Sequence, residues 1–258
     1  MPAPINPLKK ALLAGETTFG CWLCLGDTYA ADVMARAGFE WLVIDGEHAP
    51  NDIRSITAQL QVLAAHDSHA IVRVPVGQTH IMKQVLDAGA QTVIVPMVES
   101  ADQARQLVRD VTYPPHGDRG VAPSVVRAAG FGEIADYGST ANDQVCLIVQ
   151  VENRAGLEAL DEILTIDGVD CVFIGPADLA ADLGHMDDIK HPDVQATIMD
   201  ALSRIRAAGK APGFLTGDDD MIRDAVKAGA QFVAVGADLL ILRNTATALA
   251  AKWNAAKG

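Results

Sequence analysis

Short apolar runs rich in branched and aromatic residues recur along the chain and alternate with segments of helical periodicity. The predicted strands are residues 20–25, 41–45, 70–74, 92–96, 145–151, 170–174, 211–215 and 231–235. Amphipathic helices are predicted between most of them, for example at 30–37, 51–65, 79–88, 100–110, 193–208, 218–228 and 238–254. Eight such units predict one (β/α)8 barrel domain over residues 1–258, with an open doubly wound sheet as the alternative.

One long segment, residues 112–144, shows neither pattern. Its prolines and glycines indicate an ordered loop with short helices, and loops of this length are often functional. Because it comes after the fourth predicted strand, we expect it to lie over the carboxyl-terminal mouth of the barrel.

Composition narrows the choice of partners. The chain has 33 acidic and 20 basic residues and a net charge of −13, which argues against nucleic acid or an anionic membrane as a partner. We see no membrane span and no signal peptide. The four cysteines, including the Cys21-x-x-Cys24 pair, lie in apolar runs and are interpreted as buried thiols in a reducing cytoplasm rather than a redox or metal pair.

Catalytic groups of such barrels lie at the carboxyl ends of strands and in the loops that follow. The polar or mouth-lining residues at these points are Asp45, Glu47, His48, Arg73, Gln150, Glu152, Asp178, Leu215 and Thr216. Strand alternation places Gln150 and Glu152 on the same face of their strand. Arg73 is a charged residue within an otherwise apolar strand. These side chains are expected to point into the mouth, where a buried Arg–Glu pair is the purely structural alternative.

Glu152 and Asp178 are the candidate metal ligands, because two carboxylates on adjacent strand ends suit Mg²⁺ or Mn²⁺. Asp178 alone could equally be the start of a helix, whose free amides can bind a carboxylate. His48 has two acidic neighbours and is the candidate acid–base group. Except for His116, the remaining histidines are expected to be solvated on the surface: His66, His69, His80, His185 and His191.

The lysines provide negative evidence. None of them lies within a predicted strand or at its carboxyl end, so a Schiff-base mechanism is not expected and a metal must serve as the electron sink. The loop after the seventh strand carries Asp218, Asp219 and Asp220, which argues against a phosphorylated substrate.

Four segments resemble the HpcH/HpaI aldolase family: FEWLVIDGEHAPN (39–51), PPHGDRG (114–120), VQVE (149–152) and FIGPADL (173–179). Within that family the likeness is greatest to the 4-hydroxy-2-oxoheptanedioate and 2-dehydro-3-deoxyglucarate aldolases. The resemblance implies a class II aldolase that joins pyruvate or hydroxypyruvate to an aldehyde through a metal-stabilised enolate. Mg²⁺ or Mn²⁺, with Co²⁺ as a further possibility, would be the cofactor, and aromatic compound catabolism a possible setting.

The resemblance also implies an assembly and residue roles. We expect a homo-hexamer, a trimer of dimers, in which the C-terminal helix is exchanged between subunits. Glu152 and Asp178 would hold the metal, and Asp87 would complete a neighbouring subunit's site. Arg73 would contact the pyruvyl oxygen, and His48 with Asp45 would handle protons, through a metal-bound water. The other implied substrate contacts are Gln150, Leu215 and the backbone at Gly175, Ala177 and Asp178. The ligand positions match the family's pattern, whereas the acceptor-facing segment 118–131 is less familiar and leaves the aldehyde partner open.

Three other functions compete with this prediction. A CoA-ester lyase of the citrate-lyase β type shares the barrel and the acid pair, but would need a basic groove that the sequence lacks. Oxaloacetate decarboxylation would use the same enolate. A non-catalytic ligand-binding barrel is the alternative from a different class, although it gives no reason for acids and an arginine at strand ends.

Overall fold

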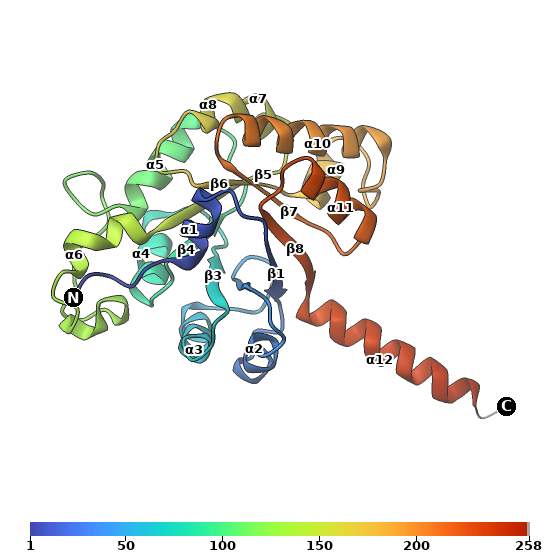
Figure 1. Cartoon of the computed structure of the whole chain (residues 1–258), viewed down its shortest axis with the longest axis horizontal. Helices are drawn as coiled ribbons and strands as arrows, with labels where there is room; N and C mark the ends of the chain where they lie inside the picture. The colour runs from blue at the N-terminus through green and yellow to red at the C-terminus, as the bar shows by residue number, and fades with distance from the viewer. Residues whose placement is uncertain (257–258) are drawn as a thin grey trace.

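The chain forms a closed barrel of eight parallel strands in sequential order, as described by a computed structural model for residues 1–256 (Figure 1). The strands are β1 (Thr18–Leu23), β2 (Trp41–Asp45), β3 (His69–Arg73), β4 (Thr92–Val95), β5 (Cys146–Val151), β6 (Cys171–Ile174), β7 (Ala211–Leu215) and β8 (Phe232–Ala237). Their bounds differ from the predicted ones by at most two residues. The barrel prediction is confirmed, and the open doubly wound sheet is wrong because β1 also pairs with β8.

Helices follow the strands as the hydrophobic pattern predicted. They are α1 (Pro7–Leu13), α2 (Thr28–Ala35), α3 (Ile53–Leu63), α4 (Thr79–Asp87), α5 (Ala101–Val111), α6 (Tyr137–Thr140), α7 (Arg154–Glu158), α8 (Leu160–Leu164), α9 (Pro176–Asp182), α10 (Pro192–Ala207), α11 (Asp219–Lys227) and α12 (Asp238–Ala255). Two 3₁₀ turns, η1 (Arg127–Gly132) and η2 (Ala141–Gln144), lie near α6. Across residues 1–256, every helix is too short or too polar to cross a bilayer.

Two apolar layers hold the barrel. Branched side chains on the outer face of the strands pack beneath the surrounding helices. Inside the barrel, aromatic rings fill the centre: the ring centroids of Trp41 and Phe232 lie 3.9 Å apart, and those of Trp22 and Phe173 5.7 Å apart. Helix α1 packs against this inner cluster through Leu8 and Leu12. The inside of the barrel is therefore solid, and chemistry is confined to its ends.

The long segment 112–144 is not where the sequence analysis placed it. Helix α5 runs antiparallel to β4, so the chain has returned to the amino-terminal end of the barrel before the segment begins. There it packs against the N-terminal residues: the Ala3 amide donates to Thr140 Oγ1 (2.8 Å), and the Asp136 amide donates to the Met1 carbonyl (3.1 Å). The expectation that it covers its own barrel's carboxyl-terminal mouth is wrong.

Two smaller expectations also need correction. His69 is not a solvated surface residue, because its Nε2 lies 2.7 Å from Thr92 Oγ1 and burial lowers the pKa of its imidazole to about 4. The cysteines are all free thiols, and three are buried as expected. Cys24 is half-buried at the end of β1, where burial raises the pKa of its thiol to about 12.

Helix α12 leaves the barrel after β8 and extends away from the rest of the chain (Figure 1). Its large apolar side chains are exposed: Leu239, Leu240, Ile241, Leu242, Leu249 and Trp253. Apolar residues gathered on one solvent-facing element are typical of an interaction surface.

Candidate active site

The site is organised around one arginine at the carboxyl-terminal end of the barrel. Asp45 ends β2 and Arg73 ends β3, and the two residues face each other in the strand register. Arg73 donates from Nε to Asp45 Oδ1 (2.9 Å) and from Nη2 to Asp45 Oδ2 (2.7 Å). This fork-to-fork geometry fixes the guanidinium plane. Burial alone would raise the pKa of the Asp45 carboxyl, but hydrogen bonding and charge from Arg73 outweigh it, so the pKa lies below its usual value.

Glu47 holds the other side of the same guanidinium. Its Oε2 lies 2.8 Å from Arg73 Nη1, and its side chain is only 16% exposed. Asp45 Oδ1 shapes this turn by accepting the backbone N–H groups of Glu47 (3.0 Å) and His48 (3.3 Å). Burial raises the pKa of the Glu47 carboxyl despite the nearby Arg73. Glu47 was predicted at the mouth and as a neighbour of His48, but its contact with Arg73 was not predicted.

Glu152 follows β5 and is 4% exposed. The amide of Met97 donates to its Oε1 (2.8 Å), and Gln150 Nε2 donates to its Oε2 (3.1 Å). Met97 sits just after β4 with a φ of 54°, a left-handed conformation that is uncommon for a residue other than glycine. Burial, with the Asp178 and Glu47 charges, raises the pKa of Glu152 to about 7. The hydrogen bond from the Met97 amide and the charge of Arg73 lower this pKa but do not outweigh the rise.

Gly175 lets β6 pass directly beside this carboxylate. A Cβ on Gly175 would lie 2.2 Å from Glu152 Oε2, so no larger residue fits without displacing the acid. Helix α9 begins there, and its first intrahelical bond runs from the Leu179 N–H to the Gly175 carbonyl. The Ala177 and Asp178 amides precede that bond and have no acceptor within the helix. Asp178 is exposed and close enough for its charge to act on Glu152.

Two further predicted residues line the mouth. Gln150 is 1% exposed, and its Oε1 is buried without a hydrogen-bond partner among the described residues. An unpaired buried acceptor at a mouth indicates a missing donor, such as water or a ligand. Leu215 ends β7, half-buried against the inner cluster. Below the mouth, the ring centroid of Trp22 lies 5.7 Å from Arg73 Cζ.

His48 lies at the edge of the site. Its side chain is 66% exposed, and its Nε2 is 3.8 Å from Glu47 Oε2. The expected partner, Asp45, instead accepts a hydrogen bond from the backbone N–H of His48, and its carboxylate is paired with Arg73. The acidic neighbour that faces the imidazole is therefore Glu47.

Asp87 is the one predicted site residue that lies elsewhere. It ends helix α4, which runs back to the amino-terminal end of the barrel. There Arg119, whose side chain is fully buried, donates from Nη2 to Asp87 Oδ1 (3.1 Å). The Arg119 guanidinium also lies over the Tyr113 ring, 4.3 Å from its centroid. Within one chain, Asp87 does not meet the other site residues.

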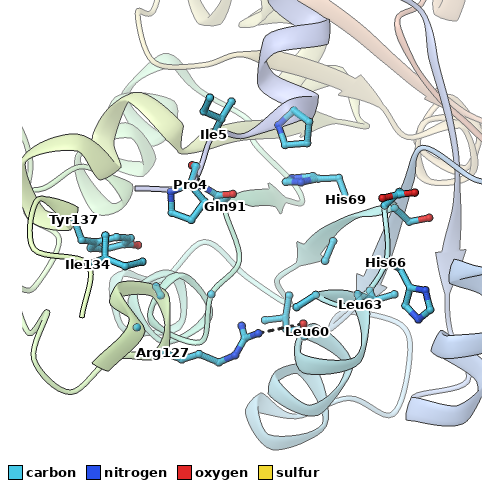
Figure 2. Close-up of a pocket in the computed structure, with 18 residues that line it drawn as sticks. Pro4, Ile5, Leu60, Leu63, His66, His69, Gln91, Arg127, Ile134 and Tyr137 are labelled. Atoms are coloured by element: carbon cyan, nitrogen blue, oxygen red, sulfur yellow. Dashed lines mark hydrogen bonds between the residues drawn. The ribbon is translucent and has the colours of Figure 1, made fainter. Parts of the chain in front are cut away.

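A separate pocket of about 550 Å³ opens at the amino-terminal end of the barrel (Figure 2). Its polar groups already have partners: His69 contacts Thr92, Gln91 donates to the Pro4 carbonyl, and Arg127 donates to the Ala88 carbonyl. None of the mouth residues lines it. The polar residues at the carboxyl ends of the strands therefore form a site separate from this pocket.

The mouth contains more negative than positive charge. Four carboxylates, those of Asp45, Glu47, Glu152 and Asp178, surround the single guanidinium of Arg73. The raised pKa values of Glu47 and Glu152 are the consequence of this crowding together with burial. The all-oxygen pair Glu152 and Asp178 has the ligand chemistry that Mg²⁺ and Mn²⁺ prefer, so these residues fit a divalent cation.

Comparison with known proteins places the chain in a family. A family model described as HpcH/HpaI aldolase/citrate lyase matches residues 18–245. The chain belongs to the HpcH/HpaI aldolase/citrate lyase family. A hydroxypyruvate/pyruvate aldolase from Roseobacter denitrificans is 58% identical over 253 residues, which cover 98% of this chain and 99% of the relative.

Two further members are similar over nearly their full lengths. A 4-hydroxy-2-oxovalerate aldolase from Rhodococcus jostii is 52% identical, covering 98% of both chains. A crystal structure of a family protein from Burkholderia cenocepacia is 45% identical and superposes with a TM-score of 0.90, covering 95% of this chain and 98% of that one. The resemblance seen in the sequence is confirmed, as is the prediction of a carbon–carbon lyase; the non-catalytic barrel is not supported.

Replacing Glu152 by glutamine tests the buried charge directly. With a folded-state pKa of about 7 against an ordinary 4.5, the native acid holds a proton that the unfolded chain releases, so metal-free stability falls as pH rises through this window. Glu152→Gln, with no charge to bury, should be more stable than wild type by about 1–3 kcal/mol at pH 8 and similar to it at pH 4.5.

Urea unfolding in EDTA at the two pH values measures this difference. Glu133→Gln, which removes an exposed carboxylate at the far end of the barrel, is the matched control and should change stability by less than about 0.5 kcal/mol at both. A Glu152→Gln variant less stable than wild type at pH 8 contradicts the raised pKa.

Proposed function

We propose that this chain is a divalent-metal-dependent, class II aldolase that forms or cleaves 4-hydroxy-2-oxo acids. Pyruvate or hydroxypyruvate is the donor, and an aldehyde is the acceptor. The observation that carries the proposal is the rigid Arg73, held by Asp45 and Glu47 beside the acid pair Glu152 and Asp178. The aldolase names of the relatives at 50–58% identity support it.

Glu152 and Asp178 would hold the cation, which is Mg²⁺ or Mn²⁺ by ligand chemistry, with Co²⁺ as a further candidate. When bound, it supplies Lewis acidity that polarises the 2-oxo group of the donor. Glu152 is oriented for this role by the Met97 amide and by Gln150. Ligand orientation by such outer contacts commonly sets metal affinity.

Arg73 has the donors that the reaction needs. A guanidinium carries five N–H groups, and three are engaged with Asp45 and Glu47. The two that remain are available for the 2-oxygen of the donor, where negative charge develops as the carbon–carbon bond breaks. Because its partners hold the guanidinium in place, little reorganisation is needed when that charge appears.

The remaining mouth residues bind the donor and handle protons. The unpaired amides of Ala177 and Asp178, beside Gly175, are suited to the donor carboxylate. Leu215 offers an apolar wall, and Gln150 Oε1 accepts a hydrogen bond from a donor in the mouth. His48, exposed at the edge, is placed to exchange protons with water near the acceptor's hydroxyl.

The same proposal includes an assembly in the cytoplasm. The exposed apolar side chains of α12 support the exchange of this helix onto a neighbouring barrel in a homo-hexamer, a trimer of dimers. Asp87, far from its own mouth, would contribute to a neighbour's site. The acceptor-facing role of segment 118–131 would likewise require a neighbouring subunit, because the segment lies at the opposite end of its own barrel.

Pyruvate release from 4-hydroxy-2-oxo acids tests the function. We expect activity that EDTA removes and that Mg²⁺ or Mn²⁺ restores, together with product formation from pyruvate or hydroxypyruvate and a panel of aldehydes. Activity that survives EDTA would contradict the class II assignment, and failure with every aldehyde would contradict the aldolase.

Removing either carboxylate tests the metal assignment. Glu152→Ala and Asp178→Ala should each abolish aldol cleavage and weaken Mn²⁺ binding, measured by calorimetry, because one carboxylate then remains. Asp167→Ala, an exposed acid remote from the mouth, should bind Mn²⁺ like wild type. Near-normal kcat at limiting metal in either mouth variant would refute the assignment.

Arg73→Lys keeps the positive charge but loses the planar guanidinium, which is hydrogen-bonded to Asp45 and Glu47. We expect kcat for cleavage to fall by about 10²-fold or more, the usual effect of losing an oxyanion donor. Steady-state kinetics measure it, with Arg54→Lys on the exposed surface as the control. A lysine variant near the wild-type rate would reduce Arg73 to a structural ion pair.

His48→Ala separates two proton-transfer roles. If His48 is the sole base, cleavage and pyruvate α-proton exchange should both fall by about 10²–10⁴-fold. Because the imidazole is 66% exposed and 3.8 Å from its nearest acid, we expect a water in the mouth to serve as base and exchange to survive better than cleavage. Equal losses, with His80→Ala unaffected, would make His48 the base.

A further inference from the structure

We propose that His185, His191 and Asp193 form a second cation site, specific for a transition metal ion such as Zn²⁺ and separate from Glu152 and Asp178. The two imidazole rings are stacked, with centroids 3.5 Å apart and planes inclined by 16°. One ligand atom from each of the three residues lies within 4.8 Å of the other two. Sequence analysis had assigned both histidines to the solvated surface.

The backbone builds this cluster at the junction of α9 and α10. The His185 N–H donates to the Ala180 carbonyl (2.8 Å) at the end of α9, and the His191 N–H donates to the Asp188 carbonyl (3.1 Å). His191 is also the N-cap of α10, where its Nδ1 accepts the Asp193 N–H (3.3 Å). The backbone at both histidines is therefore fixed by the helix ends.

The ring nitrogens have little else to bind. Among residues 1–256, the imidazole of His185 makes no hydrogen bond, and His191 makes only the long capping bond through Nδ1, which leaves its Nε2 free. The rings are half-buried, whereas the Asp193 side chain is 81% exposed. Two partly desolvated imidazoles with unused nitrogens, and an exposed carboxylate beside them, are suited to ligate a metal ion whose remaining positions are filled by water.

The donor set selects the kind of metal. Two imidazoles and a carboxylate are ligands that Zn²⁺, Ni²⁺ and Cu²⁺ prefer, whereas the all-oxygen pair in the mouth suits Mg²⁺ or Mn²⁺. Zn–N bonds of about 2.0–2.1 Å at a tetrahedral angle separate two ligand nitrogens by about 3.3 Å. Because the lone pairs of stacked rings lie in two nearly parallel planes, the rings must unstack by side-chain rotation to direct two nitrogens at one ion.

The cluster lies at the same end of the barrel as the mouth. Lys190, next to His191, pairs with Asp218, which follows β7. Helix α9 carries Asp178 in its first turn and joins the cluster just beyond its last. A bound ion would therefore clamp α9 to α10, and we expect it to raise the melting temperature without completing the catalytic site.

Calorimetric Zn²⁺ titration of untagged full-length protein in saturating Mg²⁺ tests the proposal. Wild type and the Glu152→Ala/Asp178→Ala double variant should each bind one Zn²⁺ per chain at this cluster. His185→Ala and His191→Asn should bind it at least about tenfold more weakly, because even outer-shell changes often cost that much. Asparagine retains a good N-cap at position 191, so loss of binding there is not loss of the helix.

Thermal melts give the second readout. Zn²⁺ should raise the melting temperature of wild type and of the His80→Ala control, and should raise it much less for His185→Ala and His191→Asn. Wild-type affinity in both histidine variants would overturn the proposal. So would Zn²⁺ binding that disappears only in the Glu152→Ala/Asp178→Ala variant, because the mouth would then be the sole site. Neither result depends on aldolase activity.

Discussion

The Asp45–Arg73 pair is the interaction on which the rest of the site depends. Two neighbouring strands end in opposite charges at facing positions, so the barrel register itself sets the geometry of the pair. The guanidinium is largely buried, with 12% of the Arg73 side chain exposed, and it lies above Trp22. Leaving either partner alone there would strand a buried charge, which typically costs 3–5 kcal/mol.

That pair also leaves the other carboxylates of the mouth without a balancing positive charge. Asp45 and Glu47 together more than neutralise Arg73, so little of its charge is left to balance Glu152 and Asp178. The pKa of Glu152 is therefore raised to about 7, because its charged form is unfavourable in this buried, acidic environment. A divalent ion beside it would stabilise the charged form.

Much of this could be predicted from the sequence, and the parts that could not share a physical reason. Strand alternation placed Arg73 and Glu152 in the mouth because side-chain direction along a strand has period two. The Met97 amide gave no signal, because a backbone donor at positive φ has no side-chain signature. Segment 112–144 lies at the opposite end from the predicted one because α5 stands between β4 and the segment and returns the chain there. The approach of His185 to His191 depends on how a turn folds between two helices.

The most direct measurement is hydrogen exchange of the pyruvate methyl group in D₂O, followed by NMR with enzyme and Mn²⁺ or Mg²⁺ but no aldehyde. If Arg73 and the acid pair stabilise charge on the 2-oxygen, the methyl protons should exchange without any acceptor, and EDTA should stop the exchange. No enzyme-dependent exchange with metal present, in protein that remains folded, would contradict the account.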